Sequence, residues 1–387
     1  MSKKLHLTSL GCPKNLVDSE VMLAQLQRNG YTICQNAGEA DLLLVNTCGF
    51  IQSAVEEGID TILELAQEKK KDPEKQLVVT GCMVQRYGQE LQRELPEVDL
   101  FIGTEGFHDI VTRINALEPR QPSIIHLADP VFIMNNATPR QISTPSHRAY
   151  LKITEGCANR CTYCLIPSIR GPLRSRTVAD LVQEAQSLEK QGVKELTLIA
   201  QDLTAYGRDL PNRQNNLIAL LTGLTADCDI PWLRLMYLHP ARIKEDLLEL
   251  IAHTPRIVPY LDVPLQHVSS RILKLMNRPY DSAYSDALLT KIRQYLPKAA
   301  IRTTFMVGFP GEHEEDLVEL AEFVKRHRFE HVGVFPYSNE EGSPASRLPD
   351  QLPEEIKSER RTRIMTIQAD ISLRNNQNYI GKKKLMS

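Results

Sequence analysis

The sequence predicts an α/β protein in which an open, mostly parallel α/β sheet domain is followed by a partial (β/α)6 barrel. Strand-like and helix-like patterns alternate over residues 1–118, as in a parallel sheet whose crossovers are helices. The alternation resumes at residue 149 with six further strand patterns, fewer than a complete barrel contains. Because the pattern is interrupted between these two parts, we expect two domains joined by a connection.

The N-terminal domain, residues 1–118, is expected to contain four strands. The run 41–46, DLLLVN, is almost continuously apolar, which is typical of a strand buried on both faces. We place the strands at 5–9, 41–46, 76–80 and 98–102. Helical periodicity predicts helices at 17–29, 52–70 and 84–95, and the first of them ends at a glycine.

Residues 119–148 lack this periodicity. Five prolines fall in the segment, at positions 119, 122, 130, 139 and 145. Proline interrupts helices and is excluded from central strands, because it cannot donate a backbone hydrogen bond. We therefore interpret the segment as an interdomain linker.

The second domain, residues 149–340, carries the barrel pattern. We expect its strands at 150–154, 195–200, 233–237, 258–263, 301–307 and 331–335, with helices that include 178–191, 244–253 and 314–328. Functional residues of parallel barrels lie at the C-terminal ends of the strands. A C-terminal helical extension, 341–375, contains an amphipathic helix at 353–374, whose charged side chains, Arg360 among them, we interpret as a solvated face.

Composition and charge exclude several classes of protein. The chain has 387 residues, a formal net charge of −2 and 42% hydrophobic residues. No apolar run is long enough to span a bilayer, and the N-terminus lacks the apolar core of a signal peptide, so we expect a cytoplasmic protein. The near-neutral charge argues against a generic nucleic-acid binder. The eight cysteines therefore indicate metal binding or redox chemistry rather than disulfides.

Three cysteines follow the first expected barrel strand with the spacing C-x3-C-x2-C. They are Cys157, Cys161 and Cys164, and we call them the central triad. Three thiolates can hold three irons of a [4Fe–4S] cluster and leave the fourth iron open for chemistry. A zinc knuckle is the alternative, but this segment lacks a nearby fourth ligand and a second C-x2-C pair. Packing of all three thiols in a core is less compatible with the polar loop around them.

Three further cysteines, far apart in the sequence, each follow an expected strand. They are Cys12, Cys48 and Cys82, the spread triad, and each has a glycine beside it. The carboxyl ends of parallel strands meet at one edge of a sheet, so the three thiols can converge. The alternative is that each is a small buried residue at a strand end. Cys34 and Cys228 lack this setting, and we assign them to packing.

The two triads carry a family resemblance. The pattern C-x3-C-x-aromatic-C, with Tyr163 as the aromatic residue, resembles the radical S-adenosylmethionine (SAM) superfamily. With a second three-cysteine set, the chain resembles the methylthiotransferases of that superfamily over nearly its whole length. The segments that fit this family are SLGCPKNLVDSE (9–20), YLDVPLQHVS (260–269), MVGFPGE (306–312) and FPYSNEEGSPA (335–345).

The resemblance implies cofactors and ligands. It implies two [4Fe–4S] clusters and SAM: the central triad would hold the cluster that cleaves SAM to a radical, and the spread triad would hold an auxiliary cluster linked to the inserted sulfur. No catalytic residue is expected beyond these cluster ligands. Tyr163, Gln201, Asp202 and Gly308 are the expected cofactor-binding residues, because they lie beside the central triad or after barrel strands. Their alternative roles are a core aromatic residue for Tyr163, a helix cap for Asp202 and a plain turn for Gly308.

The substrate is suggested by the residues after the first cysteine. Pro13 and Lys14 resemble the branch of the family that modifies an aspartate of a small-subunit ribosomal protein, whereas the tRNA-modifying branch typically has Gln and Met there. The resemblance implies that a methylthio group is added to the aspartate β-carbon and that the ribosomal protein is the partner; the sulfur donor and the reductant are left open. The alternatives are methylthiolation of an adenosine in tRNA, a non-catalytic iron–sulfur carrier and a zinc-binding interaction protein.

The C-terminal end departs from the family pattern. Members usually continue into a TRAM domain, a small β-barrel associated with substrate binding. Residues 376–387 contain QNYIGKK, which resembles the first TRAM strand, and too few residues follow to close a barrel. We expect a truncated TRAM domain, and without it no direct binding of nucleic acid.

Overall fold

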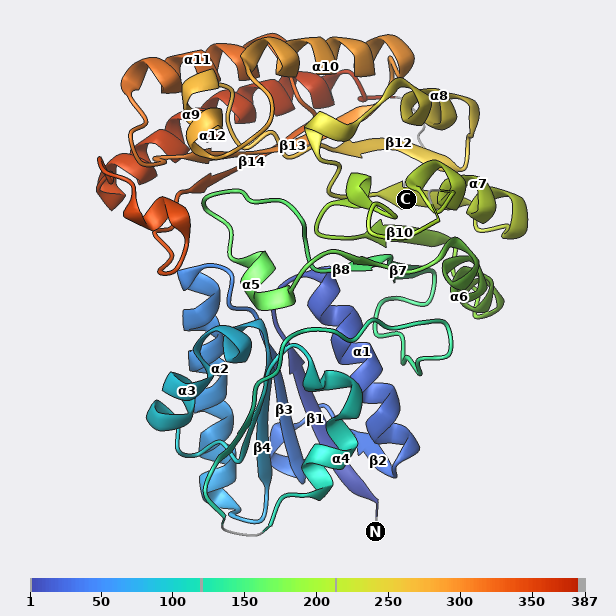
Figure 1. Cartoon of the computed structure of the whole chain (residues 1–387), viewed down its shortest axis with the longest axis vertical. Helices are drawn as coiled ribbons and strands as arrows, with labels where there is room; N and C mark the ends of the chain where they lie inside the picture. Colours follow the sequence, from blue (N-terminus) through green and yellow to red (C-terminus); the bar gives the residue numbers. More distant parts are fainter. Residues whose placement is uncertain (1, 119–120, 213, 382–387) are drawn as a thin grey trace. The chain divides into compact units, whose positions relative to one another are not determined.

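The computed structural model describes residues 2–118, 121–212 and 214–381 (Figure 1). Contacts within the chain divide it into two compact units. The first unit consists of residues 1–145, 155–158 and 165–176, and the second consists of 146–154, 159–164 and the chain from 177 onward. Both units are α/β structures with parallel sheets, which confirms the expected fold class.

The first unit is built on a six-stranded parallel sheet with the order β2-β1-β3-β4-β5-β6. Its strands are β1 (Lys3–Ser9), β2 (Tyr31–Ile33), β3 (Leu42–Thr47), β4 (Gln76–Gly81), β5 (Leu100–Ile102) and β6 (Ile124–His126). The four expected strands are confirmed as β1, β3, β4 and β5. The other two have only three residues each, too short for a period to be recognised in the sequence.

The interpretation of residues 119–148 as an interdomain linker has to be corrected. β6 lies within this segment and pairs with β5, with Leu100 opposite Ile124. The first unit continues to residue 145, and β7 of the second unit begins at Arg148. Proline is tolerated beside an edge strand, and β6 is at the edge of its sheet, so the proline content does not exclude it. Residues 119 and 120 lie outside the described residues.

The first unit contains five helices in its described part, three of which follow the strands β1, β3 and β4. They are α1 (Pro13–Arg28), α2 (Gln52–Lys71), α3 (Cys82–Glu94), α4 (Ile110–Asn115) and α5 (Ile166–Arg170), with short 3-10 turns at Ala37–Glu39 and Gly106–Asp109. α1 starts earlier than its apolar period indicates, because proline at the first helical position needs no backbone donor. Apolar residues of β3 and β4, such as Leu43, Val45 and Leu77, form one buried cluster with Ile62 and Leu65 of α2.

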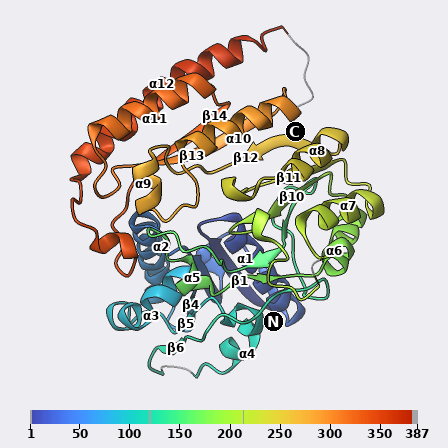
Figure 2. The same ribbon diagram turned by 45° about the horizontal axis from the view of Figure 1, so that its top comes forward.

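The second unit contains a six-stranded sheet with the order β14-β13-β12-β11-β10-β7, again parallel throughout. Its strands are β7 (Arg148–Lys152), β10 (Glu195–Ile199), β11 (Trp232–Leu235), β12 (Ile257–Asp262), β13 (Ala300–Val307) and β14 (His331–Pro336). Neighbours in the sheet follow one another along the chain (Figure 2), as in a barrel and unlike a doubly wound sheet. The partial (β/α)6 barrel is therefore confirmed.

Helices lie between the barrel strands and after the last one. They are α6 (Val178–Lys190), α7 (Leu217–Asp227), α8 (Glu245–His253), α9 (Ser270–Leu275), α10 (Ser282–Tyr295), α11 (Glu314–His327) and α12 (Glu354–Gln377), with 3-10 turns at Leu203–Ala205, Pro240–Arg242 and Pro344–Arg347. A separate two-stranded sheet consists of β8 (Thr154–Glu155) and β9 (Arg174–Ser175). Among the described residues, no helix is both long enough and apolar enough to cross a membrane.

The last helix, α12, packs along α11 and β14, and two expectations about it are wrong (Figure 2). Its charged side chains are not all solvated: Lys357 and Arg360 are buried, and Arg360 pairs with Glu312 over 2.6 Å. The described part of the expected TRAM strand is not extended either, because α12 runs to Gln377 and a turn follows at 378–381. A strand needs a neighbour to complete its hydrogen bonds, whereas a helix does not. Residues 382–387 lie outside the described residues.

Candidate functional site

The spread triad lies at the carboxyl ends of three adjacent strands. Cys12 follows β1, Cys48 follows β3 and Cys82 follows β4, and β3 pairs with both of the other strands. Thr47 lies opposite Gly81, so the last two cysteines continue from paired positions. All three thiols are close enough for their charges to influence one another. The structure therefore brings together the three residues that the sequence places at strand ends.

Two glycines allow the cysteine-bearing turns to approach one another. Gly11 has a φ of +92°, and a Cβ atom there would lie 2.8 Å from the Cβ of Cys48. A Cβ atom at Gly49 would lie 2.6 Å from the Cα of Met83. Neither position has room for a side chain, and Gly11 also has a backbone conformation that other residues rarely adopt. The close approach of the three turns thus depends on glycine.

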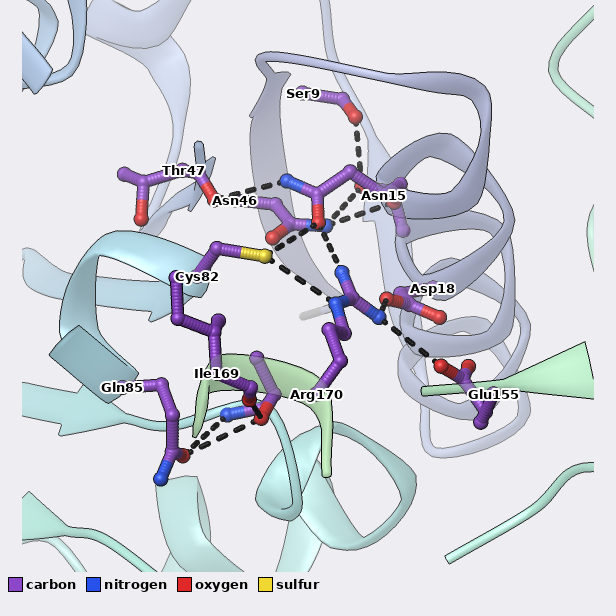
Figure 3. Close-up of polar contacts among 12 residues, drawn as sticks. Ser9, Asn15, Asp18, Asn46, Thr47, Cys82, Gln85, Glu155, Ile169 and Arg170 are labelled. Carbon is purple, nitrogen blue, oxygen red and sulfur yellow. Dashed lines mark hydrogen bonds and ion pairs between the residues drawn. The ribbon is translucent and has the colours of Figure 1, made fainter. Parts of the chain in front are cut away.

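The guanidinium of Arg170 faces the sulfur of Cys82 (Figure 3). Its Nε donates a hydrogen bond to Cys82 Sγ over 3.3 Å. Its Nη1 forms an ion pair with Asp18 over 2.6 Å and lies 3.6 Å from a carboxylate oxygen of Glu155, and its Nη2 donates to the side-chain oxygen of Asn15. Arg170 is only 3% exposed. A buried positive charge is therefore held against one sulfur of the triad.

The three thiols differ in their electrostatic surroundings. Burial raises the pKa of Cys82 to about 12, against the opposing effect of Arg170, and burial also raises the pKa of Cys48. For Cys12, burial acts in the same direction, but the charges of Lys14 and Arg170 and nearby backbone N–H groups outweigh it and lower the pKa. A metal that replaces the thiol proton supplies the positive charge that a buried thiolate needs.

The donor set of the spread triad fits an iron–sulfur cluster. All three residues are free cysteines, and thiolates are the usual ligands of [4Fe–4S] clusters. Within residues 2–118, 121–212 and 214–381, no three side chains of His, Cys, Asp or Glu are grouped so as to hold one metal ion. The thiolates of a cluster bind different irons, so such a set does not have to converge on a single ion.

The central triad is divided between the two units. Cys157 belongs to the first unit, where its backbone N–H donates to Gly171 over 3.1 Å. Cys161 and Cys164 belong to the second unit, where the Cys164 N–H donates to the Cys161 carbonyl over 3.1 Å. Arg278, 8% exposed, donates from Nη1 to Cys161 Sγ over 3.4 Å. The donor chemistry again fits a cluster with three thiolate ligands.

Asp202 is fixed by neighbours rather than by capping a helix. It begins the turn Leu203–Ala205, but its side chain makes no capping bond there. Its carboxylate pairs with Arg242 and accepts a hydrogen bond of 2.8 Å from Asn159, which lies between two cysteines of the central triad. Burial opposes the ionised form, but Arg242 contributes to a pKa of Asp202 that is lowered overall. Gln201, beside it, is partly exposed, and contact of either residue with SAM stays a prediction.

Tyr163 and Gly308 have structural explanations. Tyr163 packs against a buried cluster that includes Ile272, Met276 and Phe309. The backbone N–H of Gly308 donates to Glu312 over 2.9 Å, and Lys357 occupies the space that a Cβ atom of Gly308 would need. Their expected contacts with SAM therefore stay predictions.

The two remaining cysteines lie outside these sites. Cys228 is buried, and its thiol lies 3.9 Å from the carbonyl oxygen of Val182. The Cys34 thiol lies 3.5 Å from the Leu5 carbonyl, at the β1–β2 side of the sheet. Both positions agree with the assignment to packing.

Sequence reasoning missed the residues that surround the sulfurs. Asn15, Asp18 and Arg170 form one buried network with Cys82, and Arg278 contacts Cys161. The sequence offers one indication of this network: Asn15 and Asp18 are three positions apart, which places both on the same side of a helix. The arginines carry no comparable signal, because their partners are far away in the sequence.

Two models of known protein families match separate parts of the chain. The model of the Uncharacterized protein family UPF0004 matches residues 4–103, and the model of the Radical SAM superfamily matches residues 151–324. The first match contains the spread triad and the second contains the central triad.

Curated relatives cover nearly the whole chain. A ribosomal protein uS12 methylthiotransferase RimO of Desulfotalea psychrophila is 52% identical over 98% of this chain and 85% of its own length. Proteins of the same name from Anaeromyxobacter sp. (strain K) and Geobacter sulfurreducens are 48% and 46% identical, each over 99% of this chain and over 81% and 85% of their own lengths.

Solved structures support the fold alone. The radical S-adenosylmethionine methyltransferase TsrM of Kitasatospora setae matches with a TM-score of 0.62 and 16% identity, over 87% of this chain and 75% of that chain. The cobalamin-dependent S-adenosylmethionine radical enzyme OxsB matches with a TM-score of 0.60 and 13% identity, over 97% of this chain and 61% of that chain.

Proposed function

Because the chain belongs to the family of ribosomal protein uS12 methylthiotransferases RimO, we propose that it adds a methylthio group to the β-carbon of an aspartate in uS12. The chain is a radical SAM methylthiotransferase, and its cofactors are SAM and two [4Fe–4S] clusters. The observation that carries the proposal is the identity of 52% over 98% of the chain. The net change replaces a C–H bond by C–S–CH3: one SAM donates the methyl group, a second SAM takes an electron from a reductant and carries the hydrogen away in 5′-deoxyadenosine, and an external sulfide source supplies the sulfur.

We propose that the central triad holds the cluster at which SAM binds and that the spread triad holds the auxiliary cluster. When bound, the first cluster supplies the electron that cleaves SAM, and the second supplies the attachment site for the inserted sulfur. The support is chemical: each triad offers three thiols, and in each triad a buried arginine donates to one of the sulfurs.

The protein's own residues position these groups. Asp202 and Arg242 hold Asn159, which fixes the loop between Cys157 and Cys161. Asn15 donates to the carbonyls of Leu10 and Thr47, so it ties together the turns that carry Cys12 and Cys48. Fixed ligands keep a cluster and its substrate in one geometry, which is the protein's contribution to cofactor chemistry.

The test is incubation of the anaerobically reconstituted protein with SAM, a reductant, a sulfide source and either uS12 or tRNA. We expect mass spectrometry to detect a methylthio mass gain on one aspartate of uS12. A gain on tRNA alone would overturn the choice of substrate and favour methylthiolation of adenosine. Iron without cleavage of SAM to 5′-deoxyadenosine would instead identify a non-catalytic carrier.

We further propose that the enzyme acts in the cytoplasm, because its proposed substrate is a ribosomal protein. Fractionation of cells that express the tagged full chain, followed by immunoblotting, tests this location. Recovery in the ribosome-containing soluble fraction is the expected outcome, and recovery with membranes would contradict it.

A further inference from the structure

We infer that Arg170 is a positioning residue that sets the reduction potential of the auxiliary cluster through its hydrogen bond to Cys82. The inference rests on the proposed assignment of the spread triad as cluster ligands. It starts from the contact of 3.3 Å between Arg170 Nε and Cys82 Sγ, inside the first unit (Figure 3). The other polar groups that hold the guanidinium are oxygens of Asp18, Glu155 and Asn15.

The guanidinium is held in place by the turns that carry the other two ligands. Asn15, which accepts from Arg170 Nη2, also donates to the Leu10 carbonyl over 3.0 Å and to the Thr47 carbonyl over 2.9 Å. Those carbonyls lie next to the turns of Cys12 and Cys48. The orientation of Arg170 is therefore set by the same backbone that places the cluster ligands, and the hydrogen bond to Cys82 is not a chance surface contact.

The charge of Arg170 is balanced by carboxylates. Asp18 lies 2.6 Å from Nη1, and Glu155 lies 3.6 Å from it. Both carboxylates are largely buried. Because these groups neutralise the guanidinium, Nε acts on the sulfur as a directed hydrogen-bond donor rather than as a free cation. Replacing a whole buried ion-pair network by apolar residues often leaves the stability of a protein unchanged. Stability alone therefore does not explain why Arg170, Asp18 and Glu155 are buried together.

Hydrogen bonds to cluster sulfurs change the redox properties of the cluster. A donor withdraws electron density from the thiolate and so favours the reduced, more negative state, which raises the reduction potential. Lysine cannot replace the donor, because a compact ammonium cannot serve Asp18, Asn15 and a sulfur in the planar pattern of arginine. Removing Arg170 is therefore expected to lower the potential of the auxiliary cluster.

The experiment is an EPR-monitored redox titration of the full chain in a background with all three cysteines of the central triad changed to alanine. Only the auxiliary cluster then contributes to the signal, and iron and sulfide analysis verifies its assembly. We expect both Arg170→Gln and Arg170→Lys to lower the midpoint potential, because neither variant reproduces the arginine donor to Cys82. Arg93→Gln is the matched control, because it removes a cation of the same unit whose side chain is 73% exposed.

Each outcome has one meaning. A full iron content with an unchanged potential in Arg170→Gln would overturn the inference and leave the proposed function intact. An equal shift in Arg93→Gln would assign the effect to overall charge and also overturn it. If Arg170→Gln does not assemble its cluster, Asp18→Asn decides: loss of that carboxylate is expected to raise the potential, and no change refutes the inference. Absence of a cluster in the parent protein would instead contradict the proposed ligand set.

Discussion

Arg278 donates a hydrogen bond from Nη1 to the sulfur of Cys161 over 3.4 Å, and both residues lie in the second unit. The same guanidinium donates to the hydroxyl of Tyr280 over 2.8 Å and to the carbonyl of Pro264 over 3.0 Å. Arg278 is 8% exposed, so its orientation is fixed by these contacts. A buried donor at one cysteine of the central triad is the counterpart, within this unit, of the contact between Arg170 and Cys82.

Replacing Arg278 by glutamine should slow reductive cleavage of SAM. The variant loses a charged donor to Cys161, an interaction of about 1.5 kcal/mol, which corresponds to about a tenfold lower rate. The measurement is 5′-deoxyadenosine formed under a fixed reductant, together with the EPR potential of the central cluster. Lys274→Gln is the control, because it removes an exposed cation only four positions away in the sequence. Equal rates in Arg278→Gln and the parent would contradict the assigned role.

Gly11→Ala should prevent assembly of the auxiliary cluster while SAM cleavage persists. The added Cβ would lie 2.8 Å from the Cβ of Cys48, too close for the two turns to keep their places. Gly30→Ala separates this contact from backbone strain, because Gly30 has a similar φ of +88° but no atom within 4 Å of the added Cβ. Both variants carry strain of about 1 kcal/mol. Iron content measures the outcome, and equal iron loss in both variants would refute the steric explanation.

The two triads should have separable roles. Cys157→Ala is expected to abolish SAM cleavage, because it removes a proposed ligand of the cluster at which SAM binds. Cys48→Ala is expected to leave cleavage intact and to block sulfur insertion. Formation of 5′-deoxyadenosine and the mass of uS12 are the two readouts. Cys34→Ala, at a packing position, should retain both. An equal loss of cleavage in the first two variants would contradict this division of labour.

The sequence predicts where the six cysteines of the two triads lie because their signals are local. Apolar runs locate β1, β3 and β4, and the cysteines follow these runs directly, so the parallel topology alone brings them to one edge. The three-residue strands are missed because hydrophobic periodicity needs several residues to be visible. The earlier start of α1 is missed because Pro13 and Lys14 add no apolar position to the periodic pattern.

The sequence also does not predict the buried charged residues, because their partners lie far away in the chain. Arg170 is separated from Cys82 by 88 positions and from Asp18 by 152 positions. A charged residue in a single sequence is most simply interpreted as solvated, because charged side chains are rarely buried. Arg360 illustrates the same error: it belongs to a strongly charged helix, yet its side chain is only 10% exposed.

Arg360→Ala should destabilise the second unit by about 3 kcal/mol at neutral pH, because it leaves the carboxylate of Glu312 buried without its ion-pair partner. Arg360 Nη1 donates to Glu312 Oε1 over 2.6 Å, and the Glu312 side chain is fully buried. The measurement is the shift of the chemical-denaturation midpoint of the full chain. Arg363→Ala is the matched control on the same helix: its pair with Glu314 is about half exposed and contributes at most about 1 kcal/mol.

The effect of Arg360→Ala should depend on pH in one direction. Burial acts to raise the pKa of Glu312, but His267, the Gly308 amide and Arg360 together lower it below its ordinary value of 4.5. A carboxyl whose pKa is lower in the folded state contributes stability above 4.5 and loses that contribution as the pH falls through the folded pKa. The difference in stability between the parent and Arg360→Ala should therefore be largest at neutral pH and shrink in acid. A difference that grows as the pH falls below 4.5 would show that the ionised Glu312 is not what Arg360 stabilises.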